Sequence, residues 1–277
     1  SGNDLNTARG RAGAAGTKAA ALFFGGEPPG YLTTTESYNG TSWTAVNSLN
    51  TGVIDQGGAG TNTSALSFGG EQSPGATDET ELWNGTNWTE VNDLATARDF
   101  LGGCRASNTA SLAFGGEIPP GGTTADTELW NGTNWTEVNN LNTTRQNVEG
   151  TGTSTAGLAV GGSPQLTAAE TWNGTNWTTG GSLNTGRSNL GAAGSTTSAL
   201  AFAGYTTTQV AVTESYNGTT WTEVADLATA RSQLGRGGSE SDNTSGIAIG
   251  GNTPTYVAAT EEWTGAGVAV GAWATGN

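Results

Sequence analysis

The sequence predicts an all-β fold made of six copies of one supersecondary unit, and three recurring phrases support this prediction. A phrase of the type Leu-Asn-Thr-Ala-Arg begins each copy, at Leu5, Leu49, Leu94, Leu141, Leu183 and Leu227. A second phrase, Leu-x-Phe-Gly-Gly or a close variant, ends at Gly26, Gly70, Gly116, Gly162, Gly204 and Gly251. A third, Trp-Asn-Gly-Thr-Asn-Trp-Thr or similar, starts at Tyr38, Trp83, Trp130, Trp172 and Tyr216, and a decayed copy starts at Trp263. The leucines are 44, 45, 47, 42 and 44 residues apart, a period typical of propellers and solenoids.

The second copy shows how one unit is expected to fold. Residues 53–60 are small and rich in glycine, which predicts an inner strand where several strands crowd together. Residues 65–70, ALSFGG, alternate large and small side chains and predict a half-buried second strand. The runs TELW at 80–83 and TNWTEV at 86–91 predict the third and fourth strands. Asn84 and Gly85 between them predict a type I′ hairpin turn, in which both residues have positive φ.

Four antiparallel strands joined by turns form one blade, so the sequence predicts a six-bladed β-propeller of four-stranded antiparallel blades. A single domain is expected over residues 1–277, with repeats at about 5–48, 49–93, 94–140, 141–182, 183–226 and 227–277. In the last repeat, Val268 stands where the second tryptophan is expected. The chain contains no methionine, even at position 1, so we expect it to be excised from a longer protein.

Composition restricts the partners that we expect. The formal charge is -15, and an acidic surface repels phosphate backbones, so nucleic acid is not expected to bind. No run approaches the ~20 apolar residues that span a bilayer, so membrane insertion is not expected. Cys104 is the single cysteine, which rules out an internal disulfide, and its small neighbours predict a buried strand position.

The Gly-Gly pair, followed by an aromatic residue and then a tryptophan at near-constant spacing, resembles the kelch repeat. This resemblance covers residues 5 to about 273 and implies a kelch-like propeller, in which the loops after the Gly-Gly pairs share a partner-binding face with the connections between blades. The phrasing, rich in Asn, Thr and Gly and nearly identical between copies, also resembles repeats in structural and fibre proteins of marine bacteriophages.

One arginine and one glutamate recur in nearly every copy. The arginines are Arg9, Arg98, Arg145, Arg187 and Arg231, and Val53 takes this place in the second copy. The glutamates are Glu36, Glu81, Glu128, Glu170, Glu214 and Glu261. A ring of guanidinium groups could clamp anionic ligands. The near one-to-one ratio favours the alternative, in which each arginine pairs with a glutamate and holds the repeat together.

The recurring aromatic residues of the third phrase also have two interpretations. Trp43, Trp88, Trp135, Trp177 and Trp221 could form stacking platforms for sugars. Their presence in every copy favours packing between blades, where each ring buries ~150–250 Å².

The loops after the Gly-Gly pairs differ most between copies. The first three loops are long and acidic, whereas the last three are shorter and uncharged. This asymmetry predicts a binding site for a protein or a cell-surface glycan. Its expected residues are Glu27, Tyr31, Glu71, Asp78, Glu79, Glu117 and Asp126. Such carboxylates could hold Ca²⁺, but no ordered Asp-x-Asp ligand run is present, and a solvated acidic face is favoured.

We expect no enzymatic activity, no cofactor and no metal site. The absence of histidine excludes His triads, His-ligated zinc and the copper site of galactose-oxidase-like kelch enzymes. The leading hypothesis is a recognition or structural module of an extracellular assembly or virion, most specifically a phage tail fibre. One alternative is a cellular kelch scaffold for protein interactions. The other is a carbohydrate-active enzyme, which needs two carboxylates ~5–9.5 Å apart.

Overall fold

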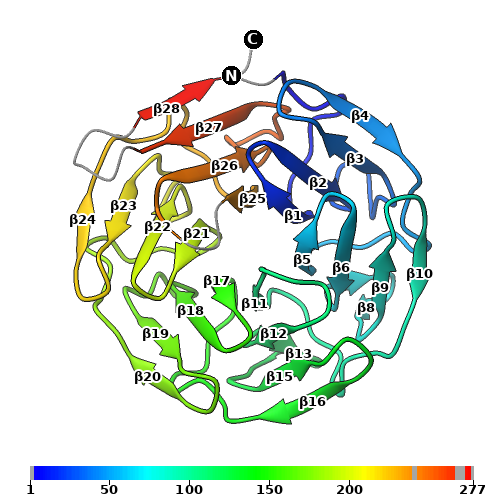
Figure 1. Ribbon diagram of the computed structural model, residues 1–277, viewed down its shortest axis with the longest axis horizontal. Helices are drawn as coiled ribbons and strands as arrows, with labels where there is room; N and C mark the ends of the chain where they lie inside the picture. Colours follow the sequence, from blue (N-terminus) through cyan, green and yellow to red (C-terminus); the bar gives the residue numbers. More distant parts are fainter. Residues whose placement is uncertain (1–2, 239–241, 266–271, 276–277) are drawn as a thin grey trace.

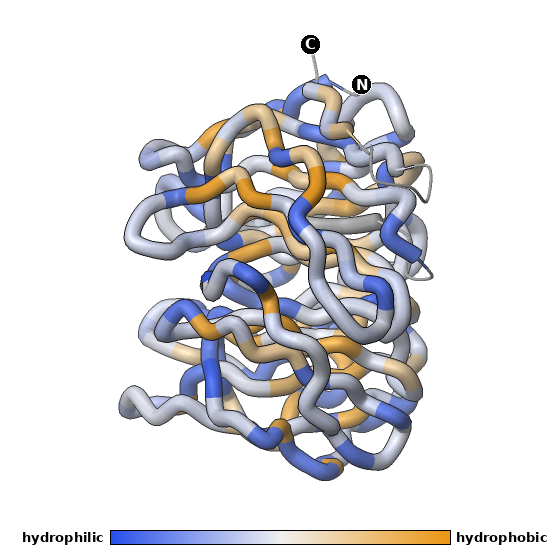
Figure 2. Tube along the Cα trace, turned by 90° about the vertical axis from the view of Figure 1, so that its left-hand side faces the viewer, coloured by the Kyte–Doolittle hydropathy of each residue, from blue (hydrophilic) through white to orange (hydrophobic). Residues whose placement is uncertain are grey.

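Six four-stranded antiparallel sheets surround one axis in the computed structural model, which describes residues 3–238, 242–265 and 272–275 (Figure 1). This arrangement confirms the predicted six-bladed propeller, and no helix occurs in the described ranges. Each sheet comes from one contiguous stretch of chain, with its first strand nearest the axis. In the side view, loops project at the edges and the most hydrophobic segments lie within the body (Figure 2).

The strands follow the repeats in order. Blades 1 and 2 contain β1 (Gly13–Thr17), β2 (Ala20–Phe24), β3 (Thr35–Tyr38), β4 (Trp43–Val46), β5 (Gly57–Thr61), β6 (Ser64–Phe68), β9 (Thr80–Trp83) and β10 (Trp88–Glu90). Blades 3 and 4 contain β11 (Gly102–Cys104), β12 (Ser111–Phe114), β15 (Thr127–Trp130), β16 (Trp135–Val138), β17 (Glu149–Thr153), β18 (Ala156–Val160), β19 (Ala169–Trp172) and β20 (Trp177–Thr179). Blades 5 and 6 contain β21 (Gly191–Ser195), β22 (Ser198–Phe202), β23 (Thr213–Tyr216), β24 (Trp221–Glu223), β25 (Gly235–Gly238), β26 (Ser245–Ile249), β27 (Thr260–Thr264) and β28 (Ala272–Thr275).

Two short hairpins extend the loops of blades 2 and 3. They are formed by β7 (Glu71–Gln72) with β8 (Gly75–Ala76), and by β13 (Glu117–Ile118) with β14 (Gly122–Thr123). Both lie in the long acidic loops that follow the Gly-Gly pairs.

The inner strands are small because aromatic rings cover them. Gly57 pairs with Phe68 across β5 and β6, and a Cβ on Gly57 would lie only 2.2 Å from that ring. Blade 4 departs from this rule, because Glu149 pairs with the smaller Val160. The loss of a phenylalanine thus leaves room for a glutamate near the axis.

The outer hairpins have a different turn from the one that the sequence predicts. Trp83 pairs with Trp88, so the loop has four residues, and positive φ occurs at Gly85 but not at Asn84. The Asn84 side chain instead accepts hydrogen bonds from the amides of Thr86 and Asn87, each at 2.9 Å. The predicted type I′ turn is therefore wrong, because a two-residue loop would separate the two tryptophans that this register pairs and buries.

The fourth-strand tryptophan links each blade to the blade before it. Trp88 of blade 2 donates to the Thr35 hydroxyl of blade 1 at 3.1 Å, and its ring centroid lies 4.9 Å from that of Phe24. Trp43 makes the equivalent bond to Thr260 at 3.2 Å, which joins blade 1 to blade 6. In blade 4 the threonine is replaced by Ala169, and Trp221 donates to the carbonyl of Gly181 instead.

The last blade corrects one sequence expectation. Trp263 pairs with Trp273, which donates to the Thr213 hydroxyl of blade 5 at 3.1 Å. The second tryptophan is therefore displaced along the chain by a longer connection rather than replaced by Val268, which itself lies outside the described residues.

Each recurring arginine contacts the glutamate of its own blade. The N–O distances are 2.8 Å for Arg9–Glu36, 2.9 Å for Arg98–Glu128, 2.9 Å for Arg145–Glu170, 3.0 Å for Arg187–Glu214 and 2.9 Å for Arg231–Glu261. All ten side chains are buried. Burial lowers the pKa of the arginines, and the attraction of the glutamates opposes this shift.

Blade 2 has Val53 in place of the arginine. Its Glu81 accepts hydrogen bonds from the amide and side chain of Asn50, at 3.0 and 2.7 Å. Burial raises the pKa of Glu81, as it also raises that of Glu128, which keeps its arginine partner.

We predict that Arg145→Ala destabilises the protein without affecting binding on the propeller face. The substitution leaves Glu170 buried and uncompensated, which costs about 3 kcal/mol of unfolding free energy. Urea denaturation measures this loss, with Glu90→Ala on the exposed outer strand β10 as a control that should change little. Unchanged stability, or a loss of binding alone, would contradict the structural role.

Candidate binding site at the channel mouth

The loops after the Gly-Gly pairs and the connections between blades lie on one face. They meet in short backbone pairs, such as Gly10 with Glu27, Ile54 with Glu71 and Asp99 with Glu117. We call this side of the ring the mouth face, because it surrounds the opening of the central channel. The structure therefore brings the most variable loops next to the axis.

A ring of six equivalent residues surrounds this opening, one from each blade. All six have a left-handed backbone, with φ between 51° and 55°: Arg11, Asp55, Phe100, Asn147, Asn189 and Gln233. Backbone hydrogen bonds join neighbours around the ring, for example from Asp55 to Arg11 at 2.8 Å and from Arg11 to Gln233 at 2.9 Å. Five such links are made among the described residues, and the missing sixth would join Phe100 to Asp55. The ring therefore opens between blades 2 and 3.

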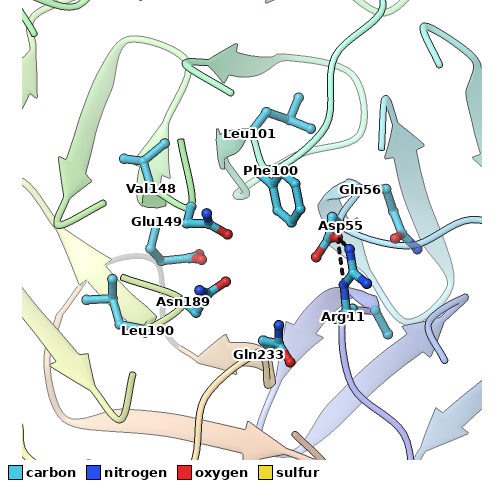
Figure 3. Close-up of a pocket in the computed structure, with 12 residues that line it drawn as sticks. Arg11, Asp55, Gln56, Phe100, Leu101, Val148, Glu149, Asn189, Leu190 and Gln233 are labelled. Atoms are coloured by element: carbon cyan, nitrogen blue, oxygen red, sulfur yellow. Dashed lines mark hydrogen bonds and ion pairs between the residues drawn. The ribbon is translucent and has the colours of Figure 1, made fainter. Parts of the chain in front are cut away.

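The six ring residues have five different side chains, although the repeats around them are nearly identical. They line a cavity of about 30 Å³ (Figure 3). Non-glycine residues rarely adopt positive φ, and such residues cluster at functional sites. Because the conformation recurs in all six blades, it belongs to the repeat, and what varies between blades is the side chain presented at the opening.

Arg11 holds one side of the mouth together. Its Nε lies 2.7 Å from Asp55 Oδ2, and its guanidinium lies 5.5 Å from the Phe100 ring centroid (Figure 3). Its Nη1 lies 3.1 Å from Glu27 Oε1. Burial opposes the charge on Arg11, but hydrogen bonds and attraction from Asp55 and Glu27 outweigh it and raise its pKa. Glu71 lies within 3.5 Å of the same guanidinium and also accepts a 2.8 Å hydrogen bond from Tyr31.

A second charged contact crosses the channel behind the ring. Arg105 of blade 3 lies 3.6 Å from Glu149 of blade 4 and donates to the carbonyl of Ala192 in blade 5 at 3.1 Å. Both charged side chains are buried. Since this arginine bridges three blades, access to a ligand is expected at the mouth rather than through the channel.

An acidic groove of about 360 Å³ lies where the ring is open. Its walls include the two short hairpins, and it is lined by Glu71, Gly75, Ala76, Asp99, Phe100, Glu117, Pro119, Pro120 and Gly121. We call this depression the acidic groove.

Asp99 is the most unusual residue of the acidic groove. Its backbone exchanges two hydrogen bonds with Glu117, at 2.9 and 3.1 Å, and residues paired in this way project their side chains from the same face. Asp99 is only 8 % exposed, and its Oδ1 has no hydrogen-bond partner among the described residues. The equivalent pairs in the other blades place Gly10, Ile54, Gln146, Ser188 or Ser232 at this position. One blade of six therefore sets two carboxylates side by side.

Burial and neighbouring charges raise the pKa of Asp99 to about 7. Desolvation is the largest cause, followed by repulsion from Asp55, Glu117 and Glu71. Desolvation also raises the pKa of Asp55 to about 6, although Arg11 opposes this shift. Asp99 thus changes its charge near neutral pH, which is typical of functional carboxylates.

The structure divides the residues that the sequence predicted for the site. Glu27, Tyr31, Glu71 and Glu117 gather around the mouth. Asp78, Glu79 and Asp126 line neither the cavity nor the acidic groove. The Glu79 carboxylate accepts from Gln72 at 2.7 Å and that of Asp126 accepts from Asn140 at 2.8 Å, so these two are held by their own loops.

Sequence reasoning missed Arg11, Asp55, Asp99 and Phe100. A signal was available, because the two positions after each recurring arginine vary widely inside an otherwise constant phrase. This variation affects single residues rather than loop length, so a comparison of the long loops does not detect it.

Among the described residues, no group of three carboxylate or thiol side chains has the geometry to hold a metal ion. The described part of the chain also contains no helix that is long and apolar enough to cross a membrane.

Comparison with known proteins supports the fold alone. No model of a known protein family matches the sequence, and no curated protein matches it. The solved structure of YjhT is similar, with a TM-score of 0.79 over 100% of this chain and 99% of that chain at 11% identity. At this identity the likeness concerns the propeller architecture.

We predict that Asp99→Asn stabilises the protein above neutral pH. Folding raises the pKa of the Asp99 carboxyl to about 7, so the ionised form destabilises the native state. The free energy of unfolding therefore falls as the pH rises from the ordinary pKa of an aspartate through about 7. Removing the charge should add about 1–2 kcal/mol at pH 8, the size expected for an unsatisfied buried group, and little at pH 5. Urea denaturation at both pH values measures the gain, which Asp126→Asn should not produce. A loss of stability at pH 8 would show that Asp99 has a stabilising partner.

Proposed function

We propose that this protein is a non-enzymatic recognition module that binds a partner on its mouth face. The observation that carries this proposal is the placement of sequence variation. The packing residues are repeated in nearly every blade, whereas the ring residues and the loops around them differ from blade to blade. Packing requires the same residues in each blade, so variation concentrated around the mouth is best explained by contact with something outside the ring.

The contact is expected to involve blades 1 to 3. These blades carry the long acidic loops and supply the five carboxylates near Arg11 and the acidic groove, namely Glu27, Asp55, Glu71, Asp99 and Glu117. Blades 4 to 6 contribute asparagine and glutamine to the ring and short uncharged loops to the face. A partner would therefore approach off the axis, over the side where the ring of backbone bonds is open.

We further propose that the module belongs to an extracellular assembly, most specifically a bacteriophage tail fibre. Its partner is then a cell-surface glycan of the host or another virion protein. The resemblance of the repeat phrasing to marine phage fibre proteins and the acidic character of the chain support this setting. Virion genes on either side of the coding sequence would support it further, and a fused cellular domain would favour a kelch-type scaffold.

One observation favours a second candidate, a carbohydrate-active enzyme. Glycosidases pair a protonated carboxylic acid of raised pKa with an ionised carboxylate, and Asp99 and Glu117 lie side by side in an open groove. Hydrolysis of chromogenic glycosides by the protein, lost in Asp99→Asn, would support this activity over recognition alone.

We predict that exchange of the acidic loops abolishes partner binding while the propeller still folds. The variant replaces residues 71–79 and 117–126 with the short uncharged loop 163–168, and its binding is measured on an array of defined glycans and against purified products of neighbouring genes. The matched control makes the same exchange at residues 205–212 of blade 5. A partner that binds the wild type and the control but not the acidic-loop variant supports the proposal. Equal binding by all three proteins would place the functional surface elsewhere.

A further inference from the structure

Two carboxylates of the acidic groove are left without a positive partner. Neither Asp99 nor Glu117 forms an ion pair among the described residues, and Asp99 Oδ1 has no hydrogen-bond partner there. Glu71, the third carboxylate of the groove, is already engaged by Arg11 and Tyr31. Like charges placed side by side on paired strands are destabilising. Protein folding alone therefore does not explain why this pair is present in one blade of six.

The contacts of Arg11 beside Phe100 show how this face accommodates a positive group. There Arg11 lies over the Phe100 ring at 5.5 Å while its nitrogens contact Asp55 and Glu27. The acidic groove offers the same combination of groups, since it is lined by Phe100 and by two carboxylates. A planar guanidinium can stack on an aromatic ring and donate to carboxylates at the same time, which a compact ammonium does less well.

We propose that the acidic groove binds the guanidinium group of an arginine side chain presented by a protein partner. Asp99 and Glu117 accept its hydrogen bonds, and Phe100 provides the stacking surface. This inference rests on the proposed function, because it names the chemistry that the mouth face selects. A groove of about 360 Å³ walled by proline and glycine residues is open enough to admit a side chain from outside.

The position of Asp99 makes binding sensitive to pH. The charged groups that surround it are Asp55, Glu71 and Glu117, with Arg11 beyond Asp55. An incoming guanidinium favours the ionised form, so it binds tightly only where Asp99 has lost its proton, and binding at neutral pH releases part of a proton. The affinity should rise as the pH increases through about 7, the pKa of free Asp99, and level off above it.

A peptide titration followed by NMR tests this inference on the full chain. The probe is acetyl-Gly-Arg-Gly-amide, and the control peptide carries citrulline, which has nearly the same shape without the charge. We expect the arginine peptide to perturb the amides of Phe100, Glu117, Ile118 and Gly121. Binding should be about thirtyfold weaker at pH 5.5 than at pH 8.5, since only the ionised fraction of Asp99 is competent. The citrulline peptide should produce no comparable shifts.

Two double variants separate the groove from general charge effects. Asp99→Asn/Glu117→Gln should lose binding at least tenfold, whereas Glu90→Gln/Glu223→Gln removes the same charge from exposed outer strands and should bind like the wild type. Urea denaturation of both variants establishes that they fold. Equal binding of the citrulline peptide, shifts outside the groove, or displacement of the peptide by equimolar Ca²⁺ would each overturn the proposal.

The guanidinium site and the proposed recognition surface can be rejected separately, because the peptide titration tests the first and the loop exchange tests the second. If the arginine peptide does not bind but the acidic-loop exchange still abolishes partner binding, the mouth face remains the recognition surface and the guanidinium site is rejected. If the peptide binds the groove while the loop exchange leaves partner binding intact, the guanidinium site stands and the proposed recognition surface is wrong.

Discussion

Burial of the fourth-strand tryptophan is the constraint on which the rest of the ring depends. Every blade comes from contiguous chain, so no strand is shared between the first blade and the last, and the ring closes through side chains and loops alone. Trp43 makes this closure by bonding to Thr260, and Asp4 adds a bond to the amide of the same threonine at 3.1 Å. In blades 1 to 5 the fourth-strand tryptophan also pairs with its hairpin partner across a four-residue loop. One residue type therefore determines the turn, the strand register and the spacing between blades.

Where this constraint is weakened, the structure compensates locally. Ala169 removes the threonine that would accept from Trp221, and a backbone carbonyl in the adjacent Gly180-Gly181 segment takes its place. Val53 removes an arginine, and Glu81 keeps the asparagine hydrogen bond that the glutamates of blades 1, 4 and 5 also accept. The Asp99–Glu117 pair differs from both cases, because no neighbouring donor takes up the charge. Compensation is thus typical of positions that serve packing, and its absence distinguishes the acidic groove.

The fold could be predicted because its determinants are repeated six times. The period, the Gly-Gly pairs and the aromatic hairpins each indicate the same blade, and errors were confined to local geometry. The Asn84-Gly85 pair suggests a two-residue turn, but the burial of Trp83 and Trp88 is a tertiary effect that local propensity does not contain. Trp273 is a second example. A longer connection moves it away from the position that the repeat spacing predicts, but it still pairs with Trp263 as the other fourth-strand tryptophans pair with their partners.

The candidate site could be predicted only in part, because it depends on which residues converge at the axis. Loop length and charge identified Glu71 and Glu117, yet they equally suggested Asp78 and Asp126, which the fold directs elsewhere. The fold places the equivalent residues of all six repeats around one opening. Residues that vary between repeats at this position therefore lie together on one surface. Asp99 and Phe100 are ordinary within their own repeat and become a site only beside Glu117 and opposite Arg11. In a closed ring of near-identical units, a binding site is therefore expected where the symmetry is broken, and the electrostatic cost of Asp99 lies at such a place.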